Sequence, residues 1–157
     1  MIVGRPASGK STLQERYFTP HGYITVNRDT LATQEKCLKV AASALKSGKS
    51  VVVDNTNPSK EVRKPYIDLA KEIKVPVRCI YLDVPADLSS HLNYFRQNQS
   101  KGEKRRVPAV GYRVFEKNFQ LPEASEGFTE VRKVEFVPQF DSAADRELFQ
   151  HWTSADS

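Results

Sequence analysis

The chain has 157 residues, with 24 Lys or Arg against 19 Asp or Glu, so its formal net charge is +5 at neutral pH. This length suits one α/β domain over residues 1–157 and is short for two, while the modest positive charge permits a polyanionic partner without requiring one. Two cysteines, Cys37 and Cys79, exclude a disulfide framework, and no apolar run reaches the length of a membrane span, so we expect a soluble, intracellular protein without a membrane partner.

The most specific motif lies at the amino end. A short apolar stretch, Met1-Ile2-Val3, leads into a full match to the phosphate-binding pattern G-x-x-x-x-G-K-[ST], made by Gly4, Arg5, Pro6, Ala7, Ser8, Gly9, Lys10, Ser11 and Thr12. In such a loop, backbone N–H groups and the positive end of the following helix hold the phosphates of ATP. Lys10 then reaches the β- and γ-phosphates, and the Ser11 hydroxyl can bind Mg²⁺. The alternative is a glycine-rich turn with a chance Lys-Ser pair.

Hydrophobic periodicity predicts alternating helices and strands along the rest of the chain. We expect a helix at 10–18, a strand at 23–26, a helix at 30–46, a strand at 50–54, a helix at 59–73 capped by Ser59, and a strand at 75–84. Helices follow from Pro85 and from Pro108, and a last strand at 131–137 precedes a polar tail. This alternation predicts an α/β fold with a P-loop kinase-type parallel sheet flanked by helices on both faces.

A polar, basic stretch at 96–106 interrupts the pattern. It lacks apolar anchors, so we expect a mobile lid. Arg96, Arg105 and Arg106 could close over the phosphates, where a lid arginine can speed transfer by roughly 10³-fold or more. Arg96, next to the ordered helix, is the best placed of the three, although most charge runs are solvated faces.

Polar residues follow the strand at 23–26, at the edge where open α/β sheets bind ligands. The sequence there is Asn27-Arg28-Asp29-Thr30. Asp29 is a candidate general base for an attacking hydroxyl, and the alternative is that it only caps the next helix. Arg28 could bind a substrate phosphate or pair with Asp29 or Asp54.

A second polar cluster follows the strand at 50–54. Asp54 lies where an indirect Mg²⁺ ligand is expected in phosphate-loop enzymes, or it caps the turn that follows. Asn55, Thr56 and Asn57 can bond an acceptor, although Asn-rich turns also arise for conformational reasons. The convergence of these clusters, the phosphate loop and the lid at one edge favours a catalytic cleft over independent surface loops.

Together these motifs resemble the kinase domain of the polynucleotide 5′-kinase/3′-phosphatase family, enzymes that repair DNA ends. The resemblance extends to about Phe140 and is carried by the phosphate loop, residues 22–31 and 53–58, Asn93-Tyr94-Phe95-Arg96, Val107-Pro108 and Gly111-Tyr112. It implies that ATP binds the loop with Mg²⁺ and that Asp29 activates a 5′-hydroxyl. It also implies that Arg28, Asn55, Thr56 and Asn57 touch the acceptor strand, and that Arg96 is a lid arginine on the ATP phosphates.

The same resemblance implies a nucleic-acid acceptor, DNA rather than RNA, and a nuclear location. Members of this family often carry an upstream phosphatase domain with a D-x-D-G-T motif. That motif does not occur in this chain, and the first strand is short. We therefore expect a kinase domain taken from a longer protein.

Two other functions fit the motifs. One is a small-molecule kinase of the same fold, such as a shikimate- or gluconate-kinase-like enzyme. The other is a regulatory module that binds a nucleoside triphosphate without transferring phosphate. A basic groove leading past Asp29, rather than a closed pocket, would favour a polynucleotide acceptor.

Overall fold

The computed structural model describes residues 1–151, and the structural statements that follow concern this part of the chain. The strands are β1 (Ile2–Gly4), β2 (Ile24–Val26), β3 (Val51–Val53), β4 (Arg78–Asp83) and β5 (Glu130–Glu135). The helices are α1 (Lys10–Tyr17), α2 (Arg28–Leu31), α3 (Gln34–Lys46), α4 (Lys60–Ile73), α5 (Ala86–Gln99), α6 (Ala109–Asn118) and α7 (Ala143–His151), with short 3₁₀ turns η1 (Thr19–His21) and η2 (Ala124–Glu126). None of the helices described is long and apolar enough to cross a membrane.

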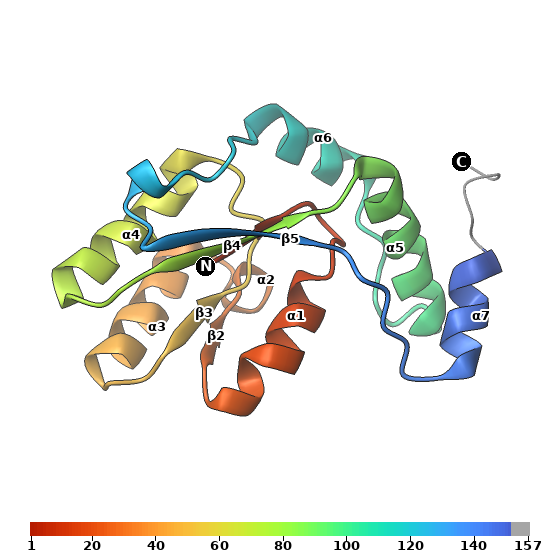
Figure 1. Ribbon diagram of the computed structural model, residues 1–157, viewed down its shortest axis with the longest axis horizontal. Coiled ribbons are helices and arrows are strands. Elements are labelled where there is room, and N and C mark those ends of the chain that lie inside the picture. Colours follow the sequence, from red (N-terminus) through yellow and green to blue (C-terminus); the bar gives the residue numbers. More distant parts are fainter. Residues whose placement is uncertain (152–157) are drawn as a thin grey trace.

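All strand pairs in the described chain are parallel. β1 pairs with β4, and β4 pairs with β5, while β2 pairs with β3. A parallel bridge between Ile2 and Asp54 joins the two groups into the spatial order β2-β3-β1-β4-β5. The central strand is therefore β1, which leads into the phosphate loop, and helices lie on both sides of the sheet (Figure 1).

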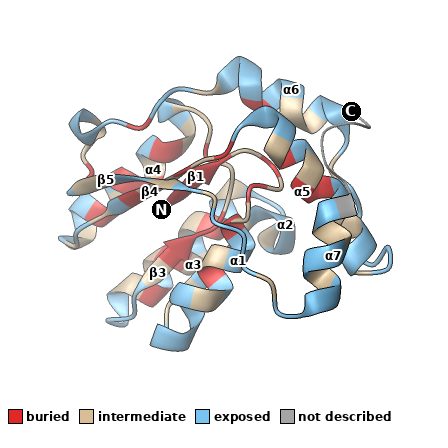
Figure 2. Ribbon diagram, turned by 45° about the vertical axis from the view of Figure 1, so that its right-hand side comes forward, coloured by how far each residue is buried: buried red, intermediate tan, exposed pale blue. Residues whose placement is uncertain are grey.

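The core follows from the alternation of side chains along each strand. Ile2 and Val52 pack on one face with residues of α1, α5 and α7. Their neighbours Val3 and Val53 pack on the other face, against α3 and α4. Figure 2 shows buried residues in β1 and β3 and on the inward faces of helices, whereas the edge strand β5 has none. The predicted parallel sheet with helices on both faces is confirmed.

The helix predicted at 30–46 is wrong as a single element, because the chain forms two helices there. Ala32, at φ +70°, ends α2, and Thr33 caps α3 by accepting a hydrogen bond from the Lys36 amide. The cap of α2 is Asn27, whose side chain accepts from the Asp29 amide, so the alternative that Asp29 is the cap is also wrong. Asp29 consequently lies on a four-residue helix of its own.

The basic stretch is better anchored than its composition predicts. Its first residues, from Arg96 to Gln99, belong to α5. The Asn93 side chain makes two hydrogen bonds of 2.9 Å with the main chain of Val107, and the Arg106 guanidinium lies 4.6 Å from the centre of the Tyr94 ring. Polar contacts therefore replace the apolar anchors that this segment lacks.

The carboxyl-terminal segment contains a helix, α7, that sequence analysis does not predict. Its Phe149 packs edge-on against Phe95 and His91 of α5, with ring centres 5.5 and 4.5 Å apart. Phe149 thereby attaches this helix to the face of the sheet that α5 covers. The two cysteines are free and buried, as expected.

Candidate functional site

The phosphate loop runs from the end of β1 to the start of α1, and both of its motif glycines have a steric reason. A Cβ on Gly4 would lie 2.8 Å from the Ser8 Oγ and 3.2 Å from the Leu82 Cβ. Gly9, the N-cap of α1, has φ +90°, a backbone conformation that favours glycine. Because glycine has no side chain, no side-chain group caps the start of α1. The first amides of α1 thus remain available for an anionic ligand.

Contacts with residues outside the loop fix its shape. The Arg5 side chain turns away from α1, donating to the Val84 carbonyl at 3.0 Å and pairing with Glu116 of α6 at 2.5 Å. Ser89 of α5, which is fully buried, donates to the Pro6 carbonyl at 2.6 Å. These contacts hold the middle of the loop, and they engage the Arg5 guanidinium with Val84 and Glu116. Of the remaining motif residues, Ala7 takes φ +55° and Thr12 is exposed.

Lys10 is the electrostatic centre of the site. Its side chain is buried, and its ammonium donates to the Arg5 carbonyl at 2.5 Å. Burial lowers the pKa of Lys10 to about 8, with a further lowering from Arg96, while Asp54 and Asp29 act in the opposite direction. Charged groups from α5, β3 and α2 therefore lie close enough to Lys10 to influence its charge, which brings together residues far apart in the sequence.

Asp54 and Ser11 form the part of the site suited to a cation. The Ser11 hydroxyl donates to Asp54 Oδ2 at 2.9 Å, and the side-chain Nδ2 of Asn27 donates to the Asp54 carbonyl at 2.9 Å. Asp54 is 3% exposed, and its Oδ1 is buried with no hydrogen-bond partner in the described chain. A hydroxyl and a carboxylate beside a phosphate loop fit Mg²⁺, which protein sites usually bind through few side chains and the substrate phosphates. Within residues 1–151, no group of three or more His, Cys, Asp or Glu side chains could hold a metal ion.

The other predicted groups lie on the exposed side of the site. Arg28 and Asp29 are both exposed, at the start of α2. The Arg28 amide donates to Asn55 Oδ1 at 2.7 Å, which joins α2 to the turn after β3. Arg28 forms no ion pair with Asp29 or Asp54 among the described residues, so neither predicted pairing is formed.

The turn after β3 is fastened to the central strand. The Gly4 amide donates to the Thr56 carbonyl at 3.2 Å, and the Asn57 side chain donates to the Ile2 carbonyl at 2.7 Å. Asn57 is 1% exposed and has φ +46°. Asn55 and Thr56 are partly accessible to solvent. The side chain of Asn57 is buried between the turn and β1, and its hydrogen bond to Ile2 supports the turn.

Three polar residues to which the sequence analysis gives no role hold the site together. Asn27 caps α2 and bonds Asp54, Asn93 fastens the end of the basic stretch, and Arg63 of α4 bonds the turn after β3 from below. The position of Arg63 on its helix could have indicated a structural role. Arg63 lies three and four residues before Tyr66 and Ile67, on the buried face of α4, where a charged residue needs a partner.

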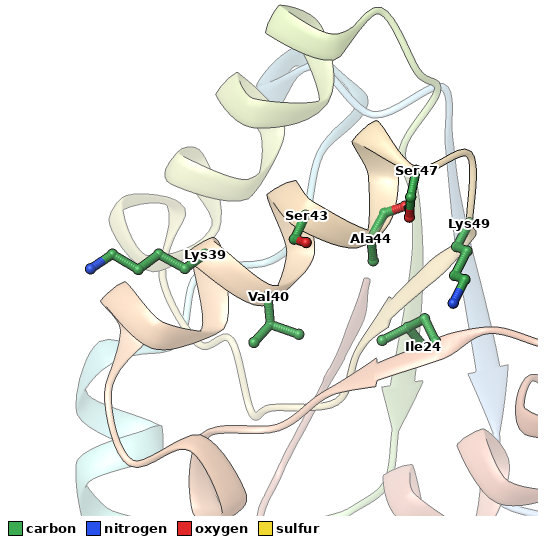
Figure 3. Close-up of a pocket in the computed structure, with 7 residues that line it drawn as sticks. All are labelled: Ile24, Lys39, Val40, Ser43, Ala44, Ser47 and Lys49. Atoms are coloured by element: carbon green, nitrogen blue, oxygen red, sulfur yellow. The ribbon is translucent and has the colours of Figure 1, made fainter.

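One cavity, of about 410 Å³, lies away from these groups. It is bordered by α3, by Ile24 at the start of β2 and by Lys49 just before β3 (Figure 3). These are the amino ends of the strands, whereas Asp29 and Asp54 follow the carboxyl ends. The cavity is therefore at the opposite edge of the sheet from the phosphate loop.

Comparison with known proteins identifies relatives that match most of this chain. The chain is 46% identical over 136 residues to the bifunctional polynucleotide phosphatase/kinase of Schizosaccharomyces pombe, and 41% identical over 137 residues to a putative bifunctional polynucleotide phosphatase/kinase of Acanthamoeba polyphaga mimivirus. Each alignment covers 87% of this chain. The chain spans only about a third of these relatives, 33% and 32% of their lengths.

The fold has a wider distribution than these sequences. The crystal structure of Chaetomium thermophilum Kti12 in complex with ADP-AlF3 matches this chain with a TM-score of 0.67 at 14% identity, covering 96% of this chain and 94% of that one. Residues 1–122 match the protein family described as AAA domain. The predicted resemblance to polynucleotide kinase/phosphatases is thus confirmed, and the chain belongs to the AAA domain family.

Proposed function

We propose that this domain transfers the γ-phosphate of ATP to the 5′-hydroxyl end of a polynucleotide, with Asp29 as the general base. The observation that carries the proposal is the relation between Asp29 and Lys10. The exposed Asp29 follows Arg28, whose amide bonds Asn55 at 2.7 Å, and the next residue of that turn, Thr56, bonds Gly4 of the phosphate loop at 3.2 Å. Burial lowers the pKa of Lys10 of that loop, and Asp29 acts in the opposite direction. An acceptor hydroxyl bound between the two groups would meet a proton acceptor on one side and the terminal phosphate on the other.

On the donor side, the loop amides and Lys10 bind the phosphates of ATP. Ser11 and, indirectly, Asp54 would hold Mg²⁺, which would supply positive charge to the phosphates. Arg96 adds a second cation from α5. Its Nε is buried without a hydrogen-bond partner in the described chain, and it is close enough to Lys10 to lower the pKa of that lysine.

On the acceptor side, Asp29 takes the proton of the 5′-hydroxyl as its oxygen forms a bond to the γ-phosphorus. The bond between that phosphorus and the bridging oxygen breaks, and ADP leaves. Arg28, Asn55 and Thr56 contact the acceptor strand, with Asn57 supporting them from beneath. General acid–base catalysis of this kind contributes about 10²–10⁴-fold.

The acceptor class rests on the relatives and on the exposure of the site. Arg28 and Asp29 are open to solvent, as the end of a long polymer requires, which supports a polynucleotide over a small enclosed substrate. We extend the proposal to DNA rather than RNA, to a nuclear location, and to a phosphatase domain elsewhere in the same protein. These three points follow from the resemblance to enzymes that repair DNA ends.

The test is incubation with γ-labelled ATP and a panel of 5′-hydroxyl DNA and RNA oligonucleotides in single-stranded, nicked and recessed forms. We expect label on 5′-hydroxyl DNA and none on the matched oligonucleotides that already carry a 5′-phosphate. Parallel reactions contain gluconate or shikimate as the acceptor, and label on one of these alone would indicate a small-molecule kinase. ATP binding without transfer to any acceptor would indicate a regulatory module.

A further inference from the structure

The α4 helix buries a complete ion pair next to the site. Arg63 is 0% exposed, and its Nε and Nη2 donate to the two carboxylate oxygens of Glu126 at 2.8 and 3.0 Å. Glu126 ends η2 and also accepts the amide of Glu123 at 2.9 Å. A buried charge pair is costly unless its remaining groups are bonded, so the other contacts of this guanidinium indicate what it is for.

Those contacts reach the turn after β3. Arg63 Nη1 donates to the carbonyls of Asn57 and Pro58 at 3.0 and 3.1 Å. The planar guanidinium thus bonds a carboxylate along one edge and two consecutive main-chain carbonyls at its other end. A lysine has one ammonium and lacks this fixed fork, so it could not hold both.

The turn that Arg63 bonds also contacts the acceptor side of the site. Above it, Asn55 Oδ1 accepts the Arg28 amide at 2.7 Å, and the next residue is Asp29. On its other side, Asn57 is bonded to Ile2 of the central strand. The turn therefore lies between the strand that leads into the phosphate loop and the helix that presents Asp29.

The donor side has anchors of its own. Ser89 bonds Pro6, and Arg5 bonds Val84 and Glu116. None of these contacts includes Arg63 or Glu126. The start of the loop does contact the turn, since the Gly4 amide donates to the Thr56 carbonyl at 3.2 Å. A change in the buried pair should therefore move the turn and α2 more than it moves the phosphate loop.

We propose that Arg63 and Glu126 are a positioning pair that sets the distance between the acceptor and the phosphate loop; the proposal rests on the proposed function of the site. The pair touches no substrate. It acts through the main chain of Asn57 and Pro58, and then through Asn55, on Arg28 and Asp29. Residues 124–126, remote in sequence from every catalytic motif, thereby become part of acceptor recognition.

The experiment replaces both charges with apolar groups of similar size, in the double variant Arg63→Met with Glu126→Leu. Apolar replacement of a buried ion pair is often neutral for stability, but neither new side chain can bond the turn. We expect kcat/KM for the 5′-hydroxyl oligonucleotide to fall on the order of 10²-fold, since small misplacements of reacting groups have effects of that size. The KM for ATP should change much less than the acceptor kcat/KM, and the Arg28 amide should lose protection from hydrogen exchange.

The matched control removes a different ion pair from the same helix. Lys64 and Asp68 pair at 2.5 Å on the exposed face of α4, so Lys64→Met with Asp68→Leu should leave acceptor kinetics and Arg28 exchange as they are. If the double variant does not fold, Glu126→Gln provides the same test, with a smaller effect in the same direction. Normal acceptor kcat/KM with normal Arg28 exchange, or equal losses for ATP and acceptor, would overturn the proposal.

The two proposals fail separately. If the unmodified protein transfers phosphate to no oligonucleotide, the proposed function is wrong. Hydrogen exchange at the Arg28 amide still reports whether the buried pair holds the turn and α2, because that measurement requires no substrate.

Discussion

The donor and acceptor halves of the site are built in different ways. Much of the donor half is buried: Ser8, Lys10 and Asp54 are 1%, 9% and 3% exposed, although Ser11 and Thr12 are exposed. The phosphate loop is also bonded to α5 and α6. The acceptor half is exposed, on a helix of four residues. So short a helix has little stability of its own, and it stays in place because Asn27 and Asn55 bond its first turn.

This difference suggests where the fold is general and where it is specialised. Burial and main-chain geometry shape the donor half, so other proteins with the same phosphate loop can share it. A few polar side chains hold the acceptor half, and each can change without disturbing the core. The identity of the acceptor should therefore depend on α2 and the turn after β3, and variants should separate the two halves.

The largest expected effect is that of Asp29→Ala. Removal of the proposed general base should lower turnover on a 5′-hydroxyl oligonucleotide by up to about 10⁴-fold. ATP binding, measured by calorimetry, should stay normal because the donor half is intact. The neighbouring exposed residue provides the control, since Thr30→Ala should keep its turnover. Unchanged transfer by the Asp29 variant would rule out that carboxylate as the base.

Arg96→Ala should have the next largest effect. Loss of a cation beside Lys10 should lower turnover by about 10³-fold, with a smaller effect on oligonucleotide binding. Single-turnover kinetics and a binding titration on the same samples separate the two quantities. Arg105→Ala and Arg106→Ala in the same basic stretch are matched controls with smaller expected losses. Equal losses of turnover and of binding for Arg96→Ala would contradict its assignment to the ATP phosphates.

Lys10→Met should abolish ATP binding and yet stabilise the protein without nucleotide. The pKa of Lys10 is about 8 in the folded chain against an ordinary 10.5, so the unfolded chain binds more protons between these values and stability rises with pH across that window. Below pH 8, the buried cation therefore destabilises the fold by about 3 kcal/mol.

Denaturant unfolding of the Lys10→Met variant at pH 7 should show a gain of up to about 3 kcal/mol, and the rise in stability between pH 8 and 10.5 should be weaker. Lys36→Met, which changes an exposed lysine, is the control and should show neither effect. A loss of stability on Lys10→Met would mean that burial of the charged lysine does not destabilise the fold.

The smallest effect compares two helix caps. Asn27→Ala and Thr33→Ala each remove an N-cap, which should lower the free energy of unfolding by about 1 kcal/mol. Asn27 also bonds Asp54 and holds Asp29, so transfer should fall only in the Asn27 variant. Equal transfer by the two variants would show that α2 does not depend on its cap for its position.

Local patterns in the sequence predict much of this molecule. The spacing of glycines and Lys10 predicts the loop, and alternation of apolar segments predicts the parallel sheet. Ser59 is predicted as a cap, and its side chain accepts the Val62 amide. The loop and the cap each depend on neighbours within a few residues. The sheet pairs distant strands, but each strand and helix is recognisable from its own segment, and their alternation predicts parallel pairing.

The missed features depend on distant partners or on an unusual backbone. Arg63 pairs with a residue 63 positions later, and no local pattern indicates that partner. Ala32 breaks the helix at a positive φ without the glycine or proline that would signal it. The basic stretch is held by Asn93 and Tyr94 on the preceding helix, so its own composition gives no sign of its anchors.

The edge strand β5 affects whether two copies of this protein can pair through their sheets. Along β5, Glu130, Arg132, Lys133 and Glu135 flank two valines. If two copies paired antiparallel about the middle of this strand, Glu130 would lie opposite Glu135, and Arg132 opposite Lys133. Like charges directly opposite one another oppose strand pairing, so this edge resists sheet extension and the self-association that open edges invite.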